Sequence, residues 1–494
     1  MMINQPKKDT FLYEQVASEL AELIQQGTFR AGERIPSVRQ LSRQRKISIT
    51  TVLQAYMLLE NQGLIETRPQ SGYYVRSKLP QLLPEPEMST PILDPTLVSV
   101  RELVMMVLKD STNPDLIQLG AAIPNTELVI PTKLNRIMAS LPRQIEHQYN
   151  YYDIPPGNEA LRIQIAQRAV GIGCNITHAD VVTTSGCLEA FTLSLRAVCH
   201  PGDTVAIESP MYFGVLQVLE SLNLRALEIP THPQDGISLS ALRFAIEHNS
   251  IQACLVLSNF NNPLGSCIPD ENKQELVKLL ARHEIPLIEG DVCGELYFSG
   301  LRPSLCKAYD RKGLVLLCSS FSKDLVPGYR VGWVVPGRFK PTIEWLKYTT
   351  NVATATLPQV AIAKFLESGG YDHHLRSIRR LYAGFVSQLS QAVMRYFPEG
   401  TRGTRPNGGI VLWVQMPDYA DSLVLYKQAL QAGITLAPGY MFSATEQYRN
   451  FIRLNAAWWS YETDRAMRRL GGLVAEQEHS LKKGFARVNG DLSK

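Results

Sequence analysis

The sequence contains no long apolar run. None of its hydrophobic stretches approaches the roughly 20 residues that a membrane-spanning helix needs, and its first residues lack the apolar core of a secretion signal. Its eight cysteines are scattered without paired spacing, so we expect neither a disulfide framework nor a metal site. No internal repeat is evident. These absences favour a protein of the reducing cytoplasm that does not enter a membrane.

The length and the charge distribution indicate more than one domain. A chain of 494 residues is too long for a single core, and its 45% hydrophobic and 19% charged content is ordinary for a folded protein. Residues 1–79 contain 11 lysines and arginines against 7 acidic residues, whereas the remaining 415 residues contain 39 of each. A solvated charged helix would explain this excess as well as a nucleic-acid contact would, so the local pattern has to decide.

That basic region has the pattern of a helix-turn-helix with a wing. Apolar residues at helical spacing predict a first helix that ends at Gly27, a second that begins near Ser37 and a third over residues 48–62. Residues 64–75 then predict two short strands joined by a turn. Three helices and a wing suit a recognition helix in the major groove of double-stranded DNA. The candidate contacts at the start of the third helix are the hydroxyls of Ser48, Thr50 and Thr51.

Residues 10–77 resemble the GntR-type winged helix, whose pattern runs through residues 32–41 and ends at the wing glycine, Gly72. The resemblance implies that Arg39 contacts phosphate or base, that Thr50 and Thr51 contact the backbone, and that Arg68 to Gly72 face the minor groove. The chain departs from the family at two positions. Ile49 and Leu53 stand where many relatives have base-reading arginines, and apolar side chains there suit thymine methyl groups instead.

Composition then sets the domain boundaries. We expect the DNA-binding domain to cover residues 9–77 and a proline-rich extended linker to cover residues 78–99. A second domain is expected over residues 100–475, followed by a flexible tail at 476–494. In the second domain, apolar strand-like runs alternate with helical segments, which indicates a buried, mostly parallel sheet. These runs lie near residues 180–184, 204–207, 253–257, 286–289, 314–317 and 332–335.

The ends of those runs carry groups that suit pyridoxal phosphate (PLP). Lys323 closes a hydroxyl-rich turn and Arg330 follows it, so an amine for a Schiff base stands beside groups that can hold a phosphate. A lone Ser-Lys pair would more often be a surface turn. Here, however, further candidate groups follow other strands in order, which favours a site. The full set of candidates is Gly186, Cys187, Tyr212, Asn262, Asp291, Ser320, Ser322, Lys323 and Arg330.

In this order the groups resemble those of the fold-type I aminotransferases, over about residues 100–475. The whole chain therefore resembles the MocR-type subfamily of GntR regulators, which joins a winged helix to an aminotransferase-like α/β domain. By that resemblance Lys323 forms the Schiff base with PLP, Tyr212 stacks on its ring and Asn262 contacts its 3-hydroxyl. The implied phosphate ligands are Ser320, Ser322, Arg330 and the amides of Gly186 and Cys187.

The resemblance also implies contacts beyond the cofactor. Arg453 would bind the carboxylate of an amino acid, and Tyr152 would reach the phosphate of a partner subunit in a head-to-tail homodimer. One departure matters most. The family usually has Glu-Asp-Asp-Val-Tyr where this chain has residues 289–293, so Gly290 replaces the acid that pairs with the pyridine nitrogen and Cys293 replaces a tyrosine.

Asp291 is the remaining candidate partner for that nitrogen, although strand alternation points its side chain to the opposite face. Without the acid PLP is a weaker electron sink, so we expect PLP binding to survive better than transamination. The sequence therefore predicts a PLP-dependent transcriptional regulator that senses a small amine or amino acid. An active aminotransferase with an appended DNA-binding module is the alternative, and a large domain that only dimerises is a third. The operator and the effector stay open.

Overall fold

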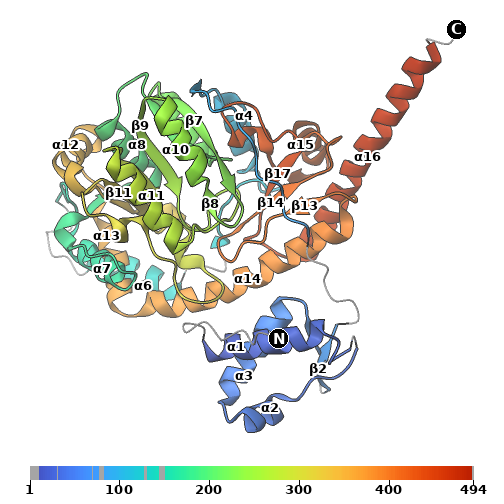
Figure 1. Cartoon of the computed structure of the whole chain (residues 1–494). Helices are drawn as coiled ribbons and strands as arrows, with labels where there is room; N and C mark the ends of the chain where they lie inside the picture. Colours follow the sequence, from blue (N-terminus) through green and yellow to red (C-terminus); the bar gives the residue numbers. More distant parts are fainter. Residues whose placement is uncertain are drawn as a thin grey trace.

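The computed structural model describes residues 11–30, 32–68, 71–76, 83–126, 131–143 and 151–491. A small N-terminal domain lies beside a much larger α/β domain, below the long helix α14 in the view of Figure 1. Within these described ranges, no helix is long and apolar enough to cross a membrane. The two-part organisation that composition indicated is therefore present.

The N-terminal domain is a three-helix winged helix. Its elements are α1 (Leu12–Gln25), α2 (Val38–Arg45), α3 (Ile49–Asn61), β1 (Ile65–Arg68) and β2 (Gly72–Val75). The Ser37 hydroxyl accepts a hydrogen bond from the Gln40 amide, and the Ser48 hydroxyl accepts one from the Thr51 amide. These two caps fix where α2 and α3 begin. Val52, Ala55, Tyr56 and Leu59 are fully buried, so one face of α3 forms the core of the domain.

A mostly parallel sheet forms the centre of the large domain. Its strands follow the order β3 (Thr96–Leu97), β7 (Arg225–His232), β6 (Thr204–Ser209), β9 (Ile251–Leu257), β10 (Leu287–Gly290), β11 (Val315–Ser320), β12 (Gly332–Val335) and β5 (Val182–Thr184). The pairs from β7 through β11 are parallel, and β12 is antiparallel to both of its neighbours. β8 (Gly236–Ile237) pairs with β7 at one end. The six strand-like runs in the sequence all became strands of this sheet.

Helices cover the sheet, and a smaller antiparallel sheet packs beside it (Figure 1). The smaller sheet has the order β13 (Arg402–Gly403), β14 (Val411–Gln415), β17 (Phe451–Asn455) and β16 (Ala437–Pro438), while β4 (Ile117–Gln118) pairs with β15 (Ile434–Thr435). The helices are α4 (Arg101–Asp110), α6 (Thr132–Ser140), α7 (Glu159–Val170), α8 (Cys187–Val198), α9 (Phe213–Ser221), α10 (Leu239–His248), α11 (Asp270–Arg282), α12 (Lys340–Asn351), α13 (Thr356–Glu367), α14 (Gly370–Tyr396), α15 (Ser422–Gln431) and α16 (Tyr461–Asp491).

The structure differs from the expected linker and tail. Residues 77–82 lie outside the described part, but the rest of segment 78–99 packs on the large domain. Leu83 is buried there, the Pro84 carbonyl accepts from the Gly403 amide, and β3 adds a strand to the main sheet. At the other end, α16 continues through Asp491, where a flexible tail was expected from 476. Proline content predicts an extended chain but not what that chain packs against.

Candidate functional site

The strand-end residues converge on one pocket of about 210 Å³. Parallel strands bring their carboxyl ends to the same edge of a sheet, which is where ligands of open α/β folds bind. The sequence candidates that line this pocket are Cys187, Tyr212, Asn262, Ser320, Ser322, Lys323 and Arg330. Spacing along the chain had predicted their order but not the apolar residues that share the pocket, which are Ala122, Leu188, Phe191, Leu257, Phe260, Ile410 and Val411 among others.

Lys323 follows β11 directly and presents its amine to the pocket. Its Nζ atom donates to the Ala122 carbonyl at 2.5 Å. Removal from water lowers the pKa of this amine to about 8, and the nearby guanidinium groups of Arg453 and Arg330 act in the same direction. A larger share of the amine is therefore neutral near pH 7 than for an ordinary lysine, which is the form that attacks an aldehyde.

Arg330 and the turn before α8 form a cradle for an anion. Arg330 donates to the Ser322 hydroxyl at 3.2 Å and to the Ser185 carbonyl at 3.2 Å. Gly186 caps α8 with φ of 92°, and a Cβ at this position would lie 2.3 Å from a guanidinium nitrogen of Arg330. Only glycine permits this approach. The guanidinium, the serine hydroxyls and the N-terminus of α8 together fit a phosphate group.

The space beside Gly290 is filled by apolar side chains. A Cβ on Gly290 would lie 2.5 Å from Leu257 Cδ2 and 2.7 Å from Phe191 Cζ. Cys293, where the family usually has tyrosine, lines the same pocket, and burial raises the pKa of its thiol to about 12. This side of the pocket therefore offers no carboxylate and a thiol that stays neutral.

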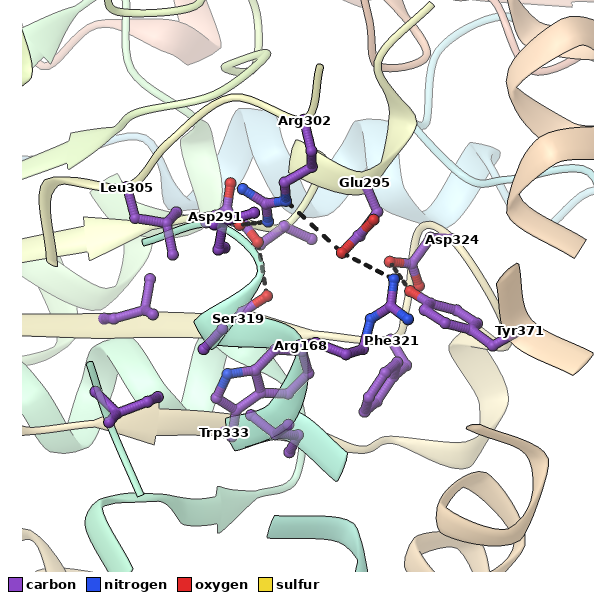
Figure 2. A pocket seen from close by; sticks show the side chains of 16 residues that line it. Arg168, Asp291, Glu295, Arg302, Leu305, Ser319, Phe321, Asp324, Trp333 and Tyr371 are labelled. Atoms are coloured by element: carbon purple, nitrogen blue, oxygen red, sulfur yellow. Dashed lines mark hydrogen bonds and ion pairs between the residues drawn. The ribbon is translucent and has the colours of Figure 1, made fainter. Parts of the chain in front are cut away.

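Asp291 does not take the place of the missing acid. Its side chain forms an ion pair with Arg302 and accepts from Asn259 Nδ2 at 2.9 Å, and it lines a second cavity of about 50 Å³ (Figure 2). The assignment of Asp291 to the cofactor is thus corrected. Residues 290 and 291 point to opposite faces of the strand end, as β alternation requires.

A partly buried charged cluster that the sequence did not indicate lies at this second cavity. Arg168 forms ion pairs with Glu295 and Asp372, and Arg379 also pairs with Glu295 at 3.0 Å. Figure 2 shows Arg168 between Glu295 and the side chains of Tyr371 and Asp324. The Tyr371 hydroxyl donates to Asp324 at 2.7 Å. Burial raises the pKa of Asp324 to about 7, and Glu295 acts in the same direction.

Two candidates lie at the edge of the pocket or away from it. Arg453 on β17 is completely buried and donates to Asn262 Oδ1 at 3.1 Å. Among the described residues no acidic side chain pairs with Arg453, and its Nε atom has no partner. Burial lowers the pKa of this guanidinium to about 10. Tyr152, by contrast, is 79% exposed and does not line the pocket of its own chain.

The DNA-binding candidates share the exposed side of α2 and α3. Arg39, Ser48 and Thr50 are exposed, while Thr51 is partly covered and exchanges a hydrogen bond with the Ser48 hydroxyl at 2.8 Å. These two hydroxyls are therefore engaged in the helix cap. Arg68 pairs with Gly72 through the backbone of the wing, and the Arg68 side chain lies outside the described part. Gly72 has φ of 108° and lies against the Arg34 guanidinium.

Comparison with known proteins matches both domains. Residues 12–75 match the gntR family of bacterial regulatory proteins, and residues 114–470 match aminotransferase class I and II. The kynurenine aminotransferase of Pyrococcus horikoshii, solved with pyridoxamine phosphate (PMP), superposes with a TM-score of 0.70 at 26% identity, over 76% of this chain and 94% of that one. The fold and the site thus define a winged helix fused to an aminotransferase-like domain.

The same fusion occurs in regulators of similar length. The HTH-type transcriptional regulators YjiR and YdcR of Escherichia coli K12, themselves uncharacterised, are each 38% identical to this chain. The alignments cover 94% of this chain and 98% and 99% of theirs. The chain belongs to this family, the MocR-type subfamily of GntR regulators.

Proposed function

We propose that this protein is a transcriptional regulator that binds double-stranded DNA through its winged helix and carries PLP on Lys323. The observation that carries the proposal is the pocket itself. It joins a lysine of lowered pKa to a phosphate cradle, yet fills the space at position 290 with Phe191 and Leu257. The domain keeps the groups that would hold PLP and lacks the acid that would drive its chemistry.

The residues of the pocket fit the phosphate and the aldehyde of PLP but not its ring nitrogen. Ser320, Ser322, Arg330 and the start of α8 would hold the phosphate, and Lys323 would hold the aldehyde carbon. When bound, PLP supplies an aldehyde that condenses with amines and a ring that withdraws electrons from the attached carbon. By the family resemblance, position 290 faces the ring nitrogen, where this chain presents apolar side chains. Binding of an amine is therefore favoured over its conversion.

Arg453 indicates that the effector has a carboxylate. This guanidinium is completely buried, and among the described residues it pairs with no acid. A buried cation without a counter-charge costs several kcal/mol by order of magnitude, and a bound carboxylate would relieve that cost by a bidentate contact. We infer that an amino acid, rather than a simple amine, is the effector.

The segment 291–302 connects this pocket to the winged helix. Val292 and Cys293 line the cofactor pocket, and the Gly300 amide donates to the Glu14 carboxylate on α1. Arg379 of α14 fixes the middle of the segment through the Glu295 carbonyl at 2.6 Å. A change at Cys293 can therefore reach the DNA-binding domain through seven residues of chain and one hydrogen bond, which is the two-site coupling that a sensor needs.

We propose that the active form is a head-to-tail homodimer. Tyr151, Tyr152 and Ile154 are more than half exposed, as are Trp345 and Tyr348 on α12. Exposed aromatic side chains support the proposed interface, because aromatic residues are enriched where protein surfaces meet. In the proposed dimer Tyr152 would reach the partner's phosphate site. Sedimentation velocity should give twice the mass of the chain.

DNA binding measured with and without PLP and amino acids tests the proposal. A labelled fragment upstream of the protein's own gene is titrated with protein, and then again after PLP and each common amino acid are added. If the protein is the proposed regulator, one amino acid changes the DNA affinity of the PLP-bound protein but not the DNA affinity of Lys323→Ala. Fast turnover of that amino acid would instead favour the aminotransferase, and no PLP spectrum would favour a domain that only dimerises.

A further inference from the structure

The recognition helix exposes a row of apolar side chains. Ile49, Leu53 and Met57 of α3 are 50%, 38% and 42% exposed. They recur every four residues, so they form one stripe along the helix. The adjoining face of α3, which includes Val52 and Tyr56, is fully buried in the core of the domain. The stripe is therefore a second apolar face that the domain itself does not cover.

The same helix contains no cation. Between Ile49 and Asn61 the only charged residue is Glu60. The basic residues stand before the helix, on α2 and the turn that follows it: Arg39, Arg43, Arg45 and Lys46, all exposed. The groups that attract phosphate are thus separated from the surface that a helix-turn-helix places against base edges.

The polar residues of α3 restrict what this surface can read. Ser48 and Thr51 are engaged with each other in the helix cap. Gln54, which is partly exposed, stands next to Leu53 in the chain. A glutamine amide pairs with the N6 and N7 atoms of adenine, and apolar side chains contact the C5 methyl of thymine. An A·T pair offers both groups in the major groove.

We propose that α3 reads A·T pairs, with Ile49 and Leu53 packed on thymine methyl groups and Gln54 bonded to an adjacent adenine. The exposed arginines and lysine that precede α3 argue for DNA as the occupant of the stripe, because they match the charge of its backbone. Ile49 and Leu53 lie in the N-terminal half of the helix, the part that contacts bases in this fold. The proposal rests on the DNA-binding function proposed above.

Replacing thymine by uracil tests this directly, since the exchange removes only the methyl group. The full-length protein is first used to select duplexes from a random library, and the enriched duplex is resynthesised with uracil at one position at a time. We expect enriched A·T pairs in each half-site. At one or two of them, uracil should weaken binding about fourfold, the effect of losing one buried methyl group.

Variants assign each methyl contact to a side chain. Leu53→Ala, at an exposed site where alanine favours the helix, should bind more weakly and lose its response to uracil at one position. Leu53→Arg should shift the selected base there toward guanine, which arginine binds in bidentate fashion. As the matched control, Arg39→Ala should weaken binding to the thymine and uracil duplexes by the same factor.

Two results would overturn the inference, and they are distinguishable. If the protein enriches no duplex from the library, the proposed DNA binding is wrong, and the proposed recognition of methyl groups by α3 is wrong with it. If a duplex is enriched but uracil at every position leaves its affinity unchanged, the protein binds DNA and α3 does not read methyl groups. Equal selection by Leu53→Arg and the unaltered protein would lead to the same conclusion.

Discussion

Phe191 of α8 occupies the space that a side chain at Gly290 of β10 would need. A Cβ on Gly290 would lie 2.7 Å from Phe191 Cζ, well inside van der Waals contact, and Leu257 closes the same space from β9. The absence of an acid at position 290 is therefore built into the packing of three elements. A side chain at position 290 would require Phe191 and Leu257 to move.

The first prediction follows from this packing. Gly290→Asp alone should destabilise the protein by about 1–3 kcal/mol, the usual cost of overpacking a core. Adding Phe191→Ala makes room for the carboxylate but removes buried contacts of its own, so it should not restore the stability. If the missing acid limits the chemistry, only this double variant with Cys293→Tyr should convert bound PLP to the amine form when an amino acid is added. Thermal unfolding and absorbance spectra measure the two effects; equal conversion by the unaltered protein would contradict the diagnosis.

The second prediction concerns the amine of Lys323. Because its pKa is lowered to about 8, the rate of PLP incorporation into cofactor-free protein should rise with pH below 8 and level off above it. An ordinary lysine would continue to gain reactivity up to its pKa of about 10.4. Borohydride reduction followed by mass spectrometry should place the adduct on Lys323, and Lys323→Ala should show none. An adduct on other lysines alone would refute the assignment.

The third prediction concerns the buried carboxyl next to that lysine. The pKa of Asp324 is raised to about 7, so the folded protein keeps it protonated while the unfolded chain ionises it near pH 4. Stability should therefore fall as pH rises from about 4 to 7. Asp324→Asn can still accept from Tyr371, and this variant should lose less stability over the same range. Asp372→Asn is the control. It changes an exposed acid that pairs with Arg168, and its stability should show the same pH dependence as that of the unaltered protein.

The fourth prediction separates two cations of the winged helix. Arg39→Ala should weaken duplex binding by about 1–3 kcal/mol if Arg39 makes a bidentate base contact. Arg68→Ala should reduce the salt dependence by about one unit if Arg68 contacts phosphate, since each neutralised phosphate releases counterions. Affinity titrations at several salt concentrations distinguish the two effects. Unchanged affinity of Arg39→Ala, or an unchanged salt slope of Arg68→Ala, would remove that residue from the DNA interface.

The fifth prediction tests the contact between the two domains. Glu14→Gln weakens the acceptor for the Gly300 amide, so it should reduce the change in DNA affinity that an effector causes while leaving PLP binding intact. Glu22→Gln, an exposed acid on the same helix, is the matched control. If both variants respond to the effector as the unaltered protein does, segment 291–302 is not the connection.

Local patterns in the sequence were sufficient to predict the winged-helix elements, six strands of the main sheet and the order of the site residues along the chain. Helical spacing and caps placed α1 to α3, and apolar runs placed β5, β6 and β9 to β12 but missed β7, because these patterns depend on near neighbours in the chain. The residues after each strand could be brought together in advance, since parallel strands end at one edge of a sheet. Tyr212, Asn262 and Lys323, which follow β6, β9 and β11, lie in one pocket for that reason.

Only the tertiary structure decided what fills the space between these elements. Phe191 beside Gly290 and the packing of residues 83–99 on the large domain each join segments far apart in sequence. No periodicity encodes such contacts, because they depend on how complete elements pack against one another. The sequence by itself therefore determined that position 290 carries no acid, and packing determined that Phe191 and Leu257 fill the space beside it.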